Sequence, residues 1–355
     1  MLQRVEQLRT LLCVEGIDAL LITKPENRRY VSGFTGTSAY IVVSQSDAVL
    51  LTDFRYVQQA SEQATGFRVV EHKVLTDTLA EQLKQMGIKK LGFEKHVLTF
   101  ETFTNYQSKL SDVELVACGP LVESLRCVKD EQELGVIQQA AIMADSAFEH
   151  ITKWMRPGIS EKDVALELEF FMRKLGASST SFETIVASGK RSSLPHGVAS
   201  DKLLEIGDFV TLDFGAFFNG YCSDLTRTVC LGRASDEQKK LYDVVLRAQL
   251  AALDGIRPGM TGKEADAIAR GVISDAGFAE QFGHGLGHGI GLEIHEGPRL
   301  STNDDTALAP GMVVTVEPGV YIPFVGGVRI EDDIVITDSG CRVLTSSPKE
   351  LLIIG

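Results

Sequence analysis

Short apolar runs alternate with amphipathic stretches through the first third of the chain. Three runs rich in aliphatic and β-branched residues predict strands: DALLIT at 18–23, AYIVVS at 39–44 and AVLLT at 48–52. Three stretches with a helical period predict helices: 2–15, 54–64 and 77–87. This alternation is typical of an α/β domain, which we assign to residues 1–122.

The pattern changes in the remaining residues, 123–355, which we expect to form a second domain. Residues 130–155 predict a long amphipathic helix, and residues 235–255 predict another. Ser235 and Gln238 have the spacing of a capping box, which marks the start of the second of these helices.

This second domain contains an internal repeat. The string GDFVTLDFG at 207–215 is echoed by GMVVTVEPG at 311–319, and RPGIS at 156–160 is echoed by RPGMT at 257–261. The repeat places four acids at matching positions, in the pairs Asp213 with Glu317 and Asp224 with Glu331. A duplicated half-domain therefore supplies two carboxylates from each half.

The first two acids flank a predicted hairpin turn. Asn219-Gly220 is typical of a two-residue type I′ turn, and this turn would place Asp213 opposite Thr226. In that register Asp213 and Asp224 point to the same face of the hairpin. Two like charges at so short a distance require a counter-charge, such as a divalent cation or a pair of cations.

The other two acids flank a longer turn, whose register the sequence leaves open. A three-residue loop at 325–327 is expected to align Glu317 with Glu331. In both halves acids lie within apolar segments that are predicted to be strands, where an unpaired charge would be costly. Because the matching positions of both halves carry acids, the sequence predicts a metal site at these residues.

Four of the seven histidines lie in glycine-rich or loop-like stretches of the C-terminal part: His196, His284, His288 and His295. None has the HExxH spacing of a helix-borne zinc site. The glycines near His288 do not fit GxGxxG, and no P-loop string occurs, so nucleotide binding has little support.

Taken together, these motifs resemble the pita-bread metallopeptidases, a family that includes methionine aminopeptidase, aminopeptidase P, prolidase and creatinase. The resemblance is carried by the acids in their two strings, by HGIGLEIH and by SLPHG, over residues 125–355. Residues 1–122, with RYVSGFTG and TDFRY, resemble the N-terminal domain of the creatinase, aminopeptidase P and prolidase branch. The resemblance implies an α/β N-terminal domain followed by an α+β catalytic domain with pseudo-twofold duplication.

The resemblance also implies a dinuclear site with five ligands: Asp213, Asp224, His288, Glu317 and Glu331. In the family pattern, Asp213 chelates one ion, Asp224 and Glu331 bridge, and His288 and Glu317 complete the other. Four carboxylates and one imidazole form a hard donor set, so two divalent ions per subunit are expected: Mn²⁺ first, with Co²⁺, Zn²⁺ or Fe²⁺ as alternatives. Such a pair would activate a hydroxide for attack on a peptide bond.

Further roles follow from the same resemblance. His295 is expected to donate to the carbonyl oxygen of the tetrahedral intermediate, His196 to contact the scissile amide or leaving group, and Glu317 to shuttle a proton. Four residues are expected to bind substrate or support the ligands: His284, Arg299, Tyr321 and Arg329. Arg299, in HEGPR, resembles the carboxylate-binding arginine of prolidases, and Arg329 either orients Glu331 or binds substrate.

The expected activity is hydrolysis of Xaa-Pro dipeptides, as in prolidase, with aminopeptidase P activity on longer proline-containing peptides as the close alternative. A catalytically inactive pita-bread module that binds peptides is a third reading, which the five intact ligands disfavour. The resemblance also implies a homodimer.

Net charge and hydropathy disfavour two other classes of partner, nucleic acids and membranes. A net charge of -13 disfavours binding to nucleic acid or to an anionic membrane. Apolar runs are too short to span a bilayer, and charged residues interrupt the N-terminal apolar stretches, so we expect a cytoplasmic protein.

Overall fold

The computed structural model of the protein describes residues 2–355 and divides the chain into two compact units. The first unit ends at Arg126 and the second begins at Cys127. Every helix within the described residues is too short or too polar to cross a lipid bilayer.

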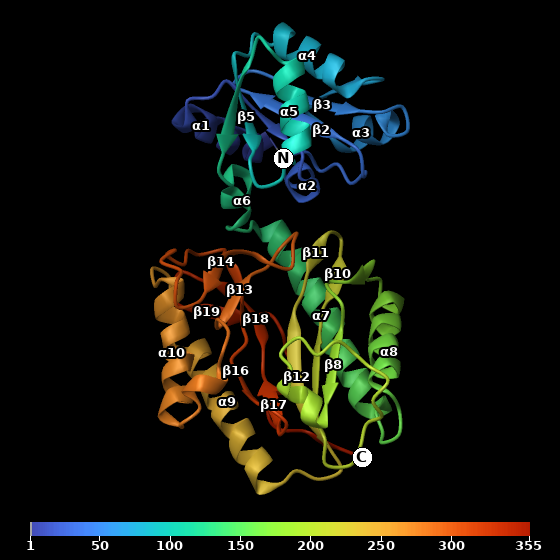
Figure 1. Ribbon diagram of the computed structural model, residues 1–355, viewed down its shortest axis with the longest axis vertical. Helices are drawn as coiled ribbons and strands as arrows, with labels where there is room; N and C mark the ends of the chain where they lie inside the picture. Colours follow the sequence, from blue (N-terminus) through green and yellow to red (C-terminus); the bar gives the residue numbers. More distant parts are fainter. Residues whose placement is uncertain (1) are drawn as a thin grey trace. The chain divides into compact units, whose positions relative to one another are not determined.

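The first unit is built on a six-stranded mixed sheet with the order β4-β3-β2-β1-β5-β6 (Figure 1). Its strands are β1 (Ala19–Ile22), β2 (Tyr40–Ser44), β3 (Ala48–Thr52), β4 (Arg68–Glu71), β5 (Lys90–Glu94) and β6 (Glu114–Cys118). Its helices are α1 (Leu2–Glu15), α2 (Pro25–Ser32), α3 (Val57–Gln63), α4 (Leu75–Gln85), α5 (Phe100–Lys109) and α6 (Leu121–Arg126). The predicted α/β class is confirmed, and the three predicted strands and three predicted helices are all present.

The centre of this sheet follows from the apolar runs. All four residues of β1 are buried, and β1 pairs antiparallel with β2 and parallel with β5. A strand buried on both faces needs a continuous apolar run, which DALLIT provides.

The second unit contains four long helices and fourteen strands within the described residues. The helices are α7 (Glu131–Trp154), α8 (Glu161–Lys174), α9 (Asp236–Gly255) and α10 (Gly262–Asp275), with the 3₁₀ turns η1 (Gly189–Ser193) and η2 (Ala279–Gln281). The strands of the first half are β7 (Ser179–Thr180), β8 (Ile185–Ser188), β9 (Phe209–Phe214), β10 (Ala216–Phe218), β11 (Tyr221–Cys222) and β12 (Leu225–Leu231). The later strands are β13 (Gly287–Gly289), β14 (Glu296–Leu300), β15 (Val313–Val316), β16 (Gly319–Ile322), β17 (Gly326–Arg329), β18 (Asp332–Ile336), β19 (Cys341–Val343) and β20 (Ile353–Ile354).

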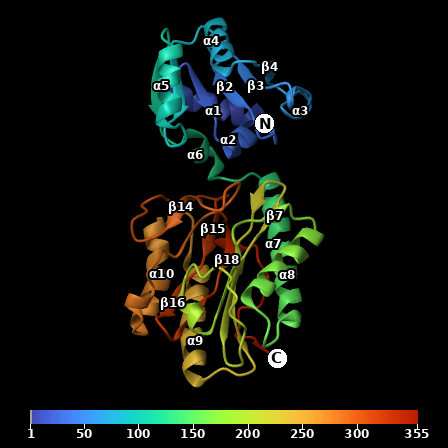
Figure 2. The ribbon, with the colours of Figure 1, turned by 45° about the vertical axis from the view of Figure 1, so that its right-hand side comes forward.

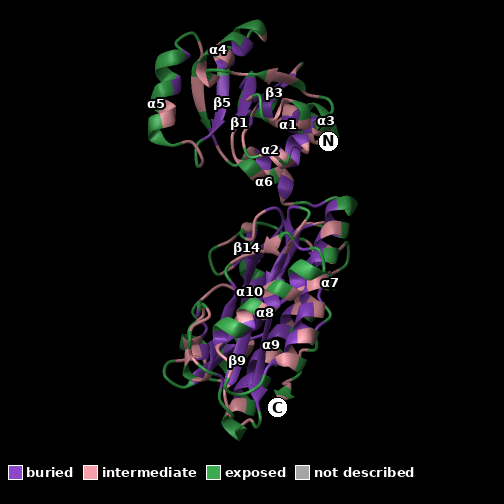
Figure 3. Cartoon of the chain, turned by 90° about the vertical axis from the view of Figure 1, so that its right-hand side faces the viewer, coloured by how far each residue is buried: buried purple, intermediate pink, exposed green. Residues whose placement is uncertain are grey.

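Each half of this unit buries its own core. In the first half, α7 and α8 pack on β9 and β12, and in the second half α9 and α10 pack on β15 and β18. Figures 1 and 2 show the strands between these two helix pairs, and Figure 3 shows buried residues along the strands and exposed residues on the outer faces of the helices. α8 and α10 begin at capping boxes on Ser160 and Thr261, which are equivalent positions of the repeat. The predicted capping box on Ser235 is also present.

The first hairpin has the predicted register. Asn219 and Gly220 both have positive φ, as a type I′ turn requires, and Asp213 lies opposite Thr226. In the second hairpin Ile322 pairs with Gly326, so the three-residue loop lies at 323–325 and the expectation of a loop at 325–327 is wrong.

Gly326 and Gly327 lie just after the turn and not within it. A Cβ on Gly327 would lie 2.5 Å from the carbonyl oxygen of Ser192 in η1, so the hairpin approaches η1 closely. The register that results still points to an alignment of Glu317 with Glu331, because Gly319 pairs with Arg329.

Gly215→Ala is expected to lower the unfolding free energy of the second unit by about 1–3 kcal/mol. A Cβ on Gly215 would lie 1.7 Å from the carbonyl oxygen of Ser223, which is backbone on the facing arm of the first hairpin and cannot rotate away. Urea unfolding measures the change. The control is Gly135→Ala, at an exposed helical glycine whose Cβ would meet no atom within 4 Å, and it should stabilise the protein by about 0.5–1 kcal/mol. Equal stability of the two variants would contradict the close approach.

Candidate active site

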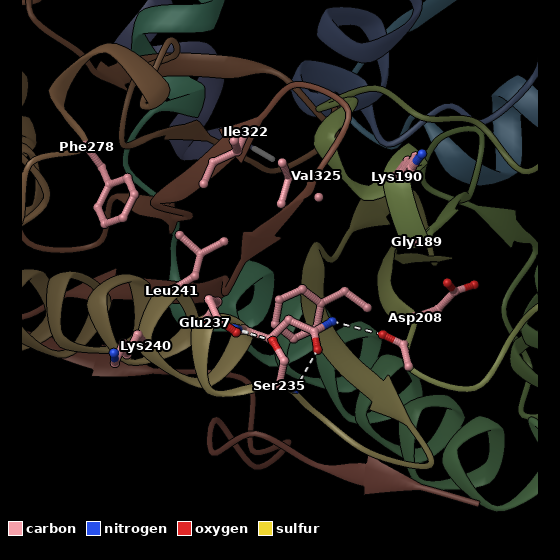
Figure 4. A pocket seen from close by; sticks show the side chains of 14 residues that line it. Gly189, Lys190, Asp208, Ser235, Glu237, Lys240, Leu241, Phe278, Ile322 and Val325 are labelled. Carbon is pink, nitrogen blue, oxygen red and sulfur yellow. Dashed lines mark hydrogen bonds between the residues drawn. The ribbon is translucent and has the colours of Figure 1, made fainter.

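One cavity of about 870 Å³ in the second unit is lined by all eleven residues predicted for the site: His196, Asp213, Asp224, His284, His288, His295, Arg299, Glu317, Tyr321, Arg329 and Glu331. A separate, more apolar pocket of about 450 Å³ lies near the tip of the β16–β17 hairpin, where Leu241, Phe278, Ile322 and Val325 gather (Figure 4). None of the eleven residues lines that second pocket, so the larger cavity is the candidate site.

Three buried carboxylates bring unpaired oxygens to this cavity. Asp213 is the penultimate residue of β9, Asp224 precedes β12, and Glu331 lies between β17 and β18. Asp213 Oδ1, Asp224 Oδ1 and Glu331 Oε1 are buried and have no hydrogen-bond partner among residues 2–355. Buried polar atoms are almost always hydrogen-bonded, so three unpaired oxygens in one cavity indicate a site for a cation.

The same carboxylates are hard to ionise without a cation. Burial raises the pKa of Asp224 and of Glu331 well above the usual range, and neighbouring carboxylates add to the effect, Glu331 on Asp224 and Glu317 on Glu331. Positive charge placed between them would reverse this shift. The site is therefore electrostatically incomplete without bound cations.

His288 presents its ring nitrogen to these acids. Its Nδ1 lies 3.1 Å from the carbonyl oxygen of Gly289, while Nε2 lies 3.7 Å from Asp224 Oδ2 and 3.5 Å from Glu317 Oε1. Burial lowers the pKa of His288 to about 4, so the ring is neutral, and assigning the proton to Nδ1 leaves a lone pair on Nε2. A histidine that donates one N–H to the backbone and turns the other nitrogen to a metal is a common ligand arrangement.

These groups are close enough to share an ion. Asp224, His288 and Glu331 each offer one ligand atom, and these three atoms lie within 4.8 Å of one another. The residues present therefore fit a divalent cation.

Glu317 is held in the bend between β15 and β16. Its Oε1 accepts a hydrogen bond from Thr315 Oγ1 at 3.2 Å, and the same hydroxyl accepts the backbone N–H of His288 at 3.0 Å. Burial is the main cause that raises the pKa of Glu317 to about 7. Thr315 therefore orients two candidate ligands, a role that the sequence analysis missed.

Thr226 and Asp333 are two further residues that the sequence analysis missed. Thr226 Oγ1 donates to Glu331 Oε2 at 2.6 Å, and Asp333 Oδ2 accepts the backbone N–H of Asp224 at 2.9 Å. Each therefore orients the candidate ligand of the other half. The spacing of 107 residues that relates Asp224 to Glu331 also relates Thr226 to Asp333, so the repeat contained a signal for both.

Arg329 is buried and connects one candidate ligand to the cavity wall. Its Nη2 pairs with Asp213 Oδ2, and its Nη1 donates to the Tyr321 hydroxyl at 2.7 Å. The partner is Asp213 and not Glu331, which corrects the expected orienting role. Asp213 Oδ1 remains available for a cation.

The Tyr321 hydroxyl also contacts His284. The Tyr321 hydroxyl lies 3.0 Å from His284 Nε2, and His284 Nδ1 lies 2.8 Å from a backbone carbonyl. Burial, followed by the charge of Arg329, lowers the pKa of His284 to about 4. The ring is therefore neutral, and a proton on Nδ1 leaves Nε2 to accept from Tyr321.

His196, His295 and Arg299 occupy the exposed side of the cavity. The ring centroids of His288 and His295 are 4.4 Å apart, and Arg299 on β14 pairs directly with His288 on β13. Desolvation and the charge of Arg299 lower the pKa of His295. All three side chains are thus placed where they can reach a substrate bound near the acids.

Comparisons with known proteins agree with this geometry. Residues 135–338 match the model of metallopeptidase family M24. The chain belongs to this family. Residues 4–128 of this M24 peptidase match the model of the creatinase/prolidase N-terminal domain, so the predicted family and two-part fold class are confirmed.

Similar proteins cover almost the whole of this M24 peptidase. It is 53% identical to a solved structure of an Xaa-Pro dipeptidase from Bacillus anthracis, with a TM-score of 0.98 over 99% of both chains. It is 41% identical to an Xaa-Pro dipeptidase from Pyrococcus furiosus, over 99% of this chain and 100% of the relative. It is also 42% identical to a solved X-Pro aminopeptidase from Thermotoga maritima, with a TM-score of 0.92 over 99% of this chain and 100% of the other.

Proposed function

We propose that this M24 peptidase hydrolyses the Xaa-Pro bond of dipeptides and releases proline, using divalent ions held by Asp213, Asp224, His288, Glu317 and Glu331. The observation that carries the proposal is the set of three unpaired, buried carboxylate oxygens of Asp213, Asp224 and Glu331 in one cavity, where Asp224 and Glu331 also lie close to His288. The similarity to two proteins named Xaa-Pro dipeptidases supports the substrate class.

The charge of the site favours two ions over one. Four ionised carboxylates and the guanidinium of Arg329 carry a net charge of about -3, so one divalent ion would leave about -1, whereas two ions would leave about +1, which one bound hydroxide would neutralise. Four carboxylates and one imidazole suit Mn²⁺, which we propose as the ion. When bound, two such ions would supply a hydroxide near neutral pH and polarise the substrate carbonyl.

The protein's own groups would orient the peptide and handle its protons. His295 is placed beside His288 and would donate an N–H to the carbonyl oxygen, which gains negative charge as the carbonyl carbon becomes tetrahedral. His196 would contact the scissile amide, and Glu317 would carry a proton to the leaving nitrogen. Apolar side chains on the cavity wall, Phe182, Ile185, Val198 and Ile294, would pack on the proline ring or on the first residue.

Arg299 is the candidate that distinguishes a dipeptide from a longer peptide. Its side chain is exposed and lines the cavity, its guanidinium has no hydrogen-bond partner among residues 2–355, and strand pairing places its backbone opposite His288. A dipeptide substrate ends in a free proline carboxylate, which an arginine fork can bind through charge-assisted hydrogen bonds. We therefore assign Arg299 to the substrate carboxylate.

Arg299→Ala is expected to raise KM for Ala-Pro about tenfold or more, the effect of losing a charged hydrogen bond of about 1.5–3 kcal/mol. The effect on Ala-Pro-Gly should be small, because its carboxylate lies one residue further away. Steady-state kinetics on both peptides measures the difference. Arg173→Ala, at an arginine of α8 that pairs with Glu169 outside the cavity, is the control and should leave both KM values unchanged.

The similarity to an X-Pro aminopeptidase keeps one alternative, in which longer peptides are the substrates. A panel of Ala-Pro, Ala-Pro-Gly and Ala-Pro-Gly-Gly, assayed for release of proline and of alanine with Mn²⁺, decides between them. The dipeptidase proposal predicts the highest kcat/KM on Ala-Pro. A higher kcat/KM on the tripeptide, or an equal loss on both peptides in Arg299→Ala, would favour the aminopeptidase.

A further inference from the structure

The segment between β8 and β9 carries His196 to the cavity, but the ring itself is not anchored. The His196 side chain is exposed and has no hydrogen-bond partner within residues 2–355. Its position therefore depends on the backbone of residues 188–200. A group that fixes this backbone would fix His196 indirectly.

Glu161 is such a group. It is the first residue of α8, and its side chain is fully buried, with 0% exposure. Oε1 accepts the N–H and the hydroxyl of Ser188 at 2.7 and 2.8 Å, and Oε2 accepts the N–H and the hydroxyl of Ser200 at 3.0 and 2.6 Å. One carboxylate therefore joins the two ends of the segment that carries His196.

Arg191 extends this connection into the segment. Its Nε donates to Glu161 Oε2 at 3.0 Å, and its Nη2 donates to the carbonyl oxygen of Val198 at 2.6 Å. Val198 lies two residues beyond His196, and the carbonyl oxygen of Pro195, just before it, accepts from Arg329 at 3.1 Å. The backbone on both sides of His196 is thus held, on one side through Glu161 and Arg191.

The repeat shows the same connection in the other half with different chemistry. Gly262 is equivalent to Glu161, and a Cβ there would lie 2.0 Å from the carbonyl oxygen of Arg299. The start of α10 therefore contacts the segment of Arg299 by close backbone approach, whereas the start of α8 reaches the segment of His196 with a buried carboxylate. In both halves the first helical residue supports a segment that faces the cavity.

We propose that Glu161 is a positioning residue, which fixes residues 188–200 so that His196 faces the substrate. This inference rests on the proposed function, since it requires His196 to contact the peptide. Glu161 itself does not line the cavity, so any effect of its substitution on turnover must be transmitted through the segment.

Glu161→Gln tests the proposal with little change in volume. The amide keeps one acceptor oxygen, but its nitrogen cannot accept from the donors at the other end of the segment. We expect kcat/KM on Ala-Pro to fall by about 10- to 100-fold, because misplacing a group that orients the substrate by about 1 Å has an effect of this size. The Kd for Mn²⁺, measured by isothermal titration calorimetry, should change by less than about twofold, because Glu161 contacts none of the five candidate ligands.

Two further measurements separate positioning from general stability. Amide hydrogen exchange should become faster in residues 188–200 and stay unchanged in β12 and β18. In a His196→Ala background, Glu161→Gln should lower kcat/KM by less than about twofold further, because both substitutions remove the same interaction. A full additional loss in the double variant would overturn the proposal, as would unchanged exchange and unchanged kcat/KM in the single variant.

The control is Asp163→Asn, in the same first turn of α8. Asp163 is exposed and completes the capping box with Ser160 but does not touch the segment, so its variant should have a lower Tm and an unchanged kcat/KM. If Glu161→Gln does not fold, Ser200→Ala removes one of the donors to Glu161 and should show a smaller, several-fold loss with the same exchange pattern. No change in Ser200→Ala would then overturn the proposal. Absence of proline release by the wild type would contradict the proposed function instead, and the exchange rates would still decide whether Glu161 holds the segment.

Discussion

Asp224→Asn is expected to reduce turnover of Ala-Pro by at least about a hundredfold at saturating Mn²⁺, a larger loss than removal of an orienting partner causes. Asp224 supplies a buried oxygen without a hydrogen-bond partner, next to His288 and Glu331. The amide fills the same volume but carries no charge, so it cannot offset two cations. Steady-state kinetics and metal analysis on the purified variant measure the effect.

The fold of the Asp224→Asn variant should persist. Without bound metal, the ionised carboxylate is unfavourable at this position, since burial raises the pKa of Asp224. The metal-free variant should therefore be at least as stable as the metal-free wild type near neutral pH. Asp243→Asn, at an exposed acid of α9, is the control for loss of a single carboxylate and should keep full activity. More than a tenth of wild-type activity in Asp224→Asn would contradict the assignment of this ligand.

Removal of metal is expected to lower the free energy of unfolding, and the size of this loss should depend on pH. Burial raises the pKa values of Asp224, Glu331 and Glu317 in the folded protein, the last to about 7. Between about pH 4, where these groups titrate in an unfolded chain, and pH 7, the metal-free native state binds more protons than the unfolded state. Stability from these groups must therefore fall as pH rises through this range.

Bound Mn²⁺ reverses this dependence, because the ions bind the ionised carboxylates. The stabilisation by metal should be small at pH 5 and should grow towards pH 8, reaching about 4 kcal/mol when free metal is a thousandfold above Kd. Urea unfolding with EDTA and with Mn²⁺ at several pH values gives the difference. Other groups titrate equally with and without metal and cancel in this comparison. A stabilisation of equal size at pH 5 and pH 8 would show that the carboxyl groups with raised pKa values do not hold the metal.

Local signals in the sequence were sufficient to predict the first hairpin and the capping box at Ser235. Asn219-Gly220 determines a two-residue turn, and the register of Asp213 and Thr226 follows from it because strand pairing counts residues outward from the turn. The second hairpin shows the limit of this reasoning. Its turn contains Phe324 at a positive φ, which is unfavourable for a phenylalanine, while Gly327, two residues after the turn, is needed for the approach to η1.

The supporting residues of the site depend on contacts between segments far apart in the chain. Glu161 and Ser200 are 39 residues apart, and Thr226 and Glu331 are 105 residues apart, so no local pattern relates them. An acid in the first turn of a helix is also typical of ordinary helix stabilisation, which conceals the buried role of Glu161. The acids of the cavity could be predicted from the sequence, because the internal repeat places them at matching positions in pairs.

Metal content and proline release, measured together, test the central claim most directly. The protein is stripped with a chelator, and Mn²⁺ is added back in steps while bound metal is counted by mass spectrometry under native conditions and proline release from Ala-Pro is followed. We predict no turnover in the stripped protein, binding of two ions per chain, and activity that rises with their binding and is at least about a hundredfold lower at every stage in Asp224→Asn. Proline release by the fully stripped protein, or full activity without metal bound to the chain, would contradict the account.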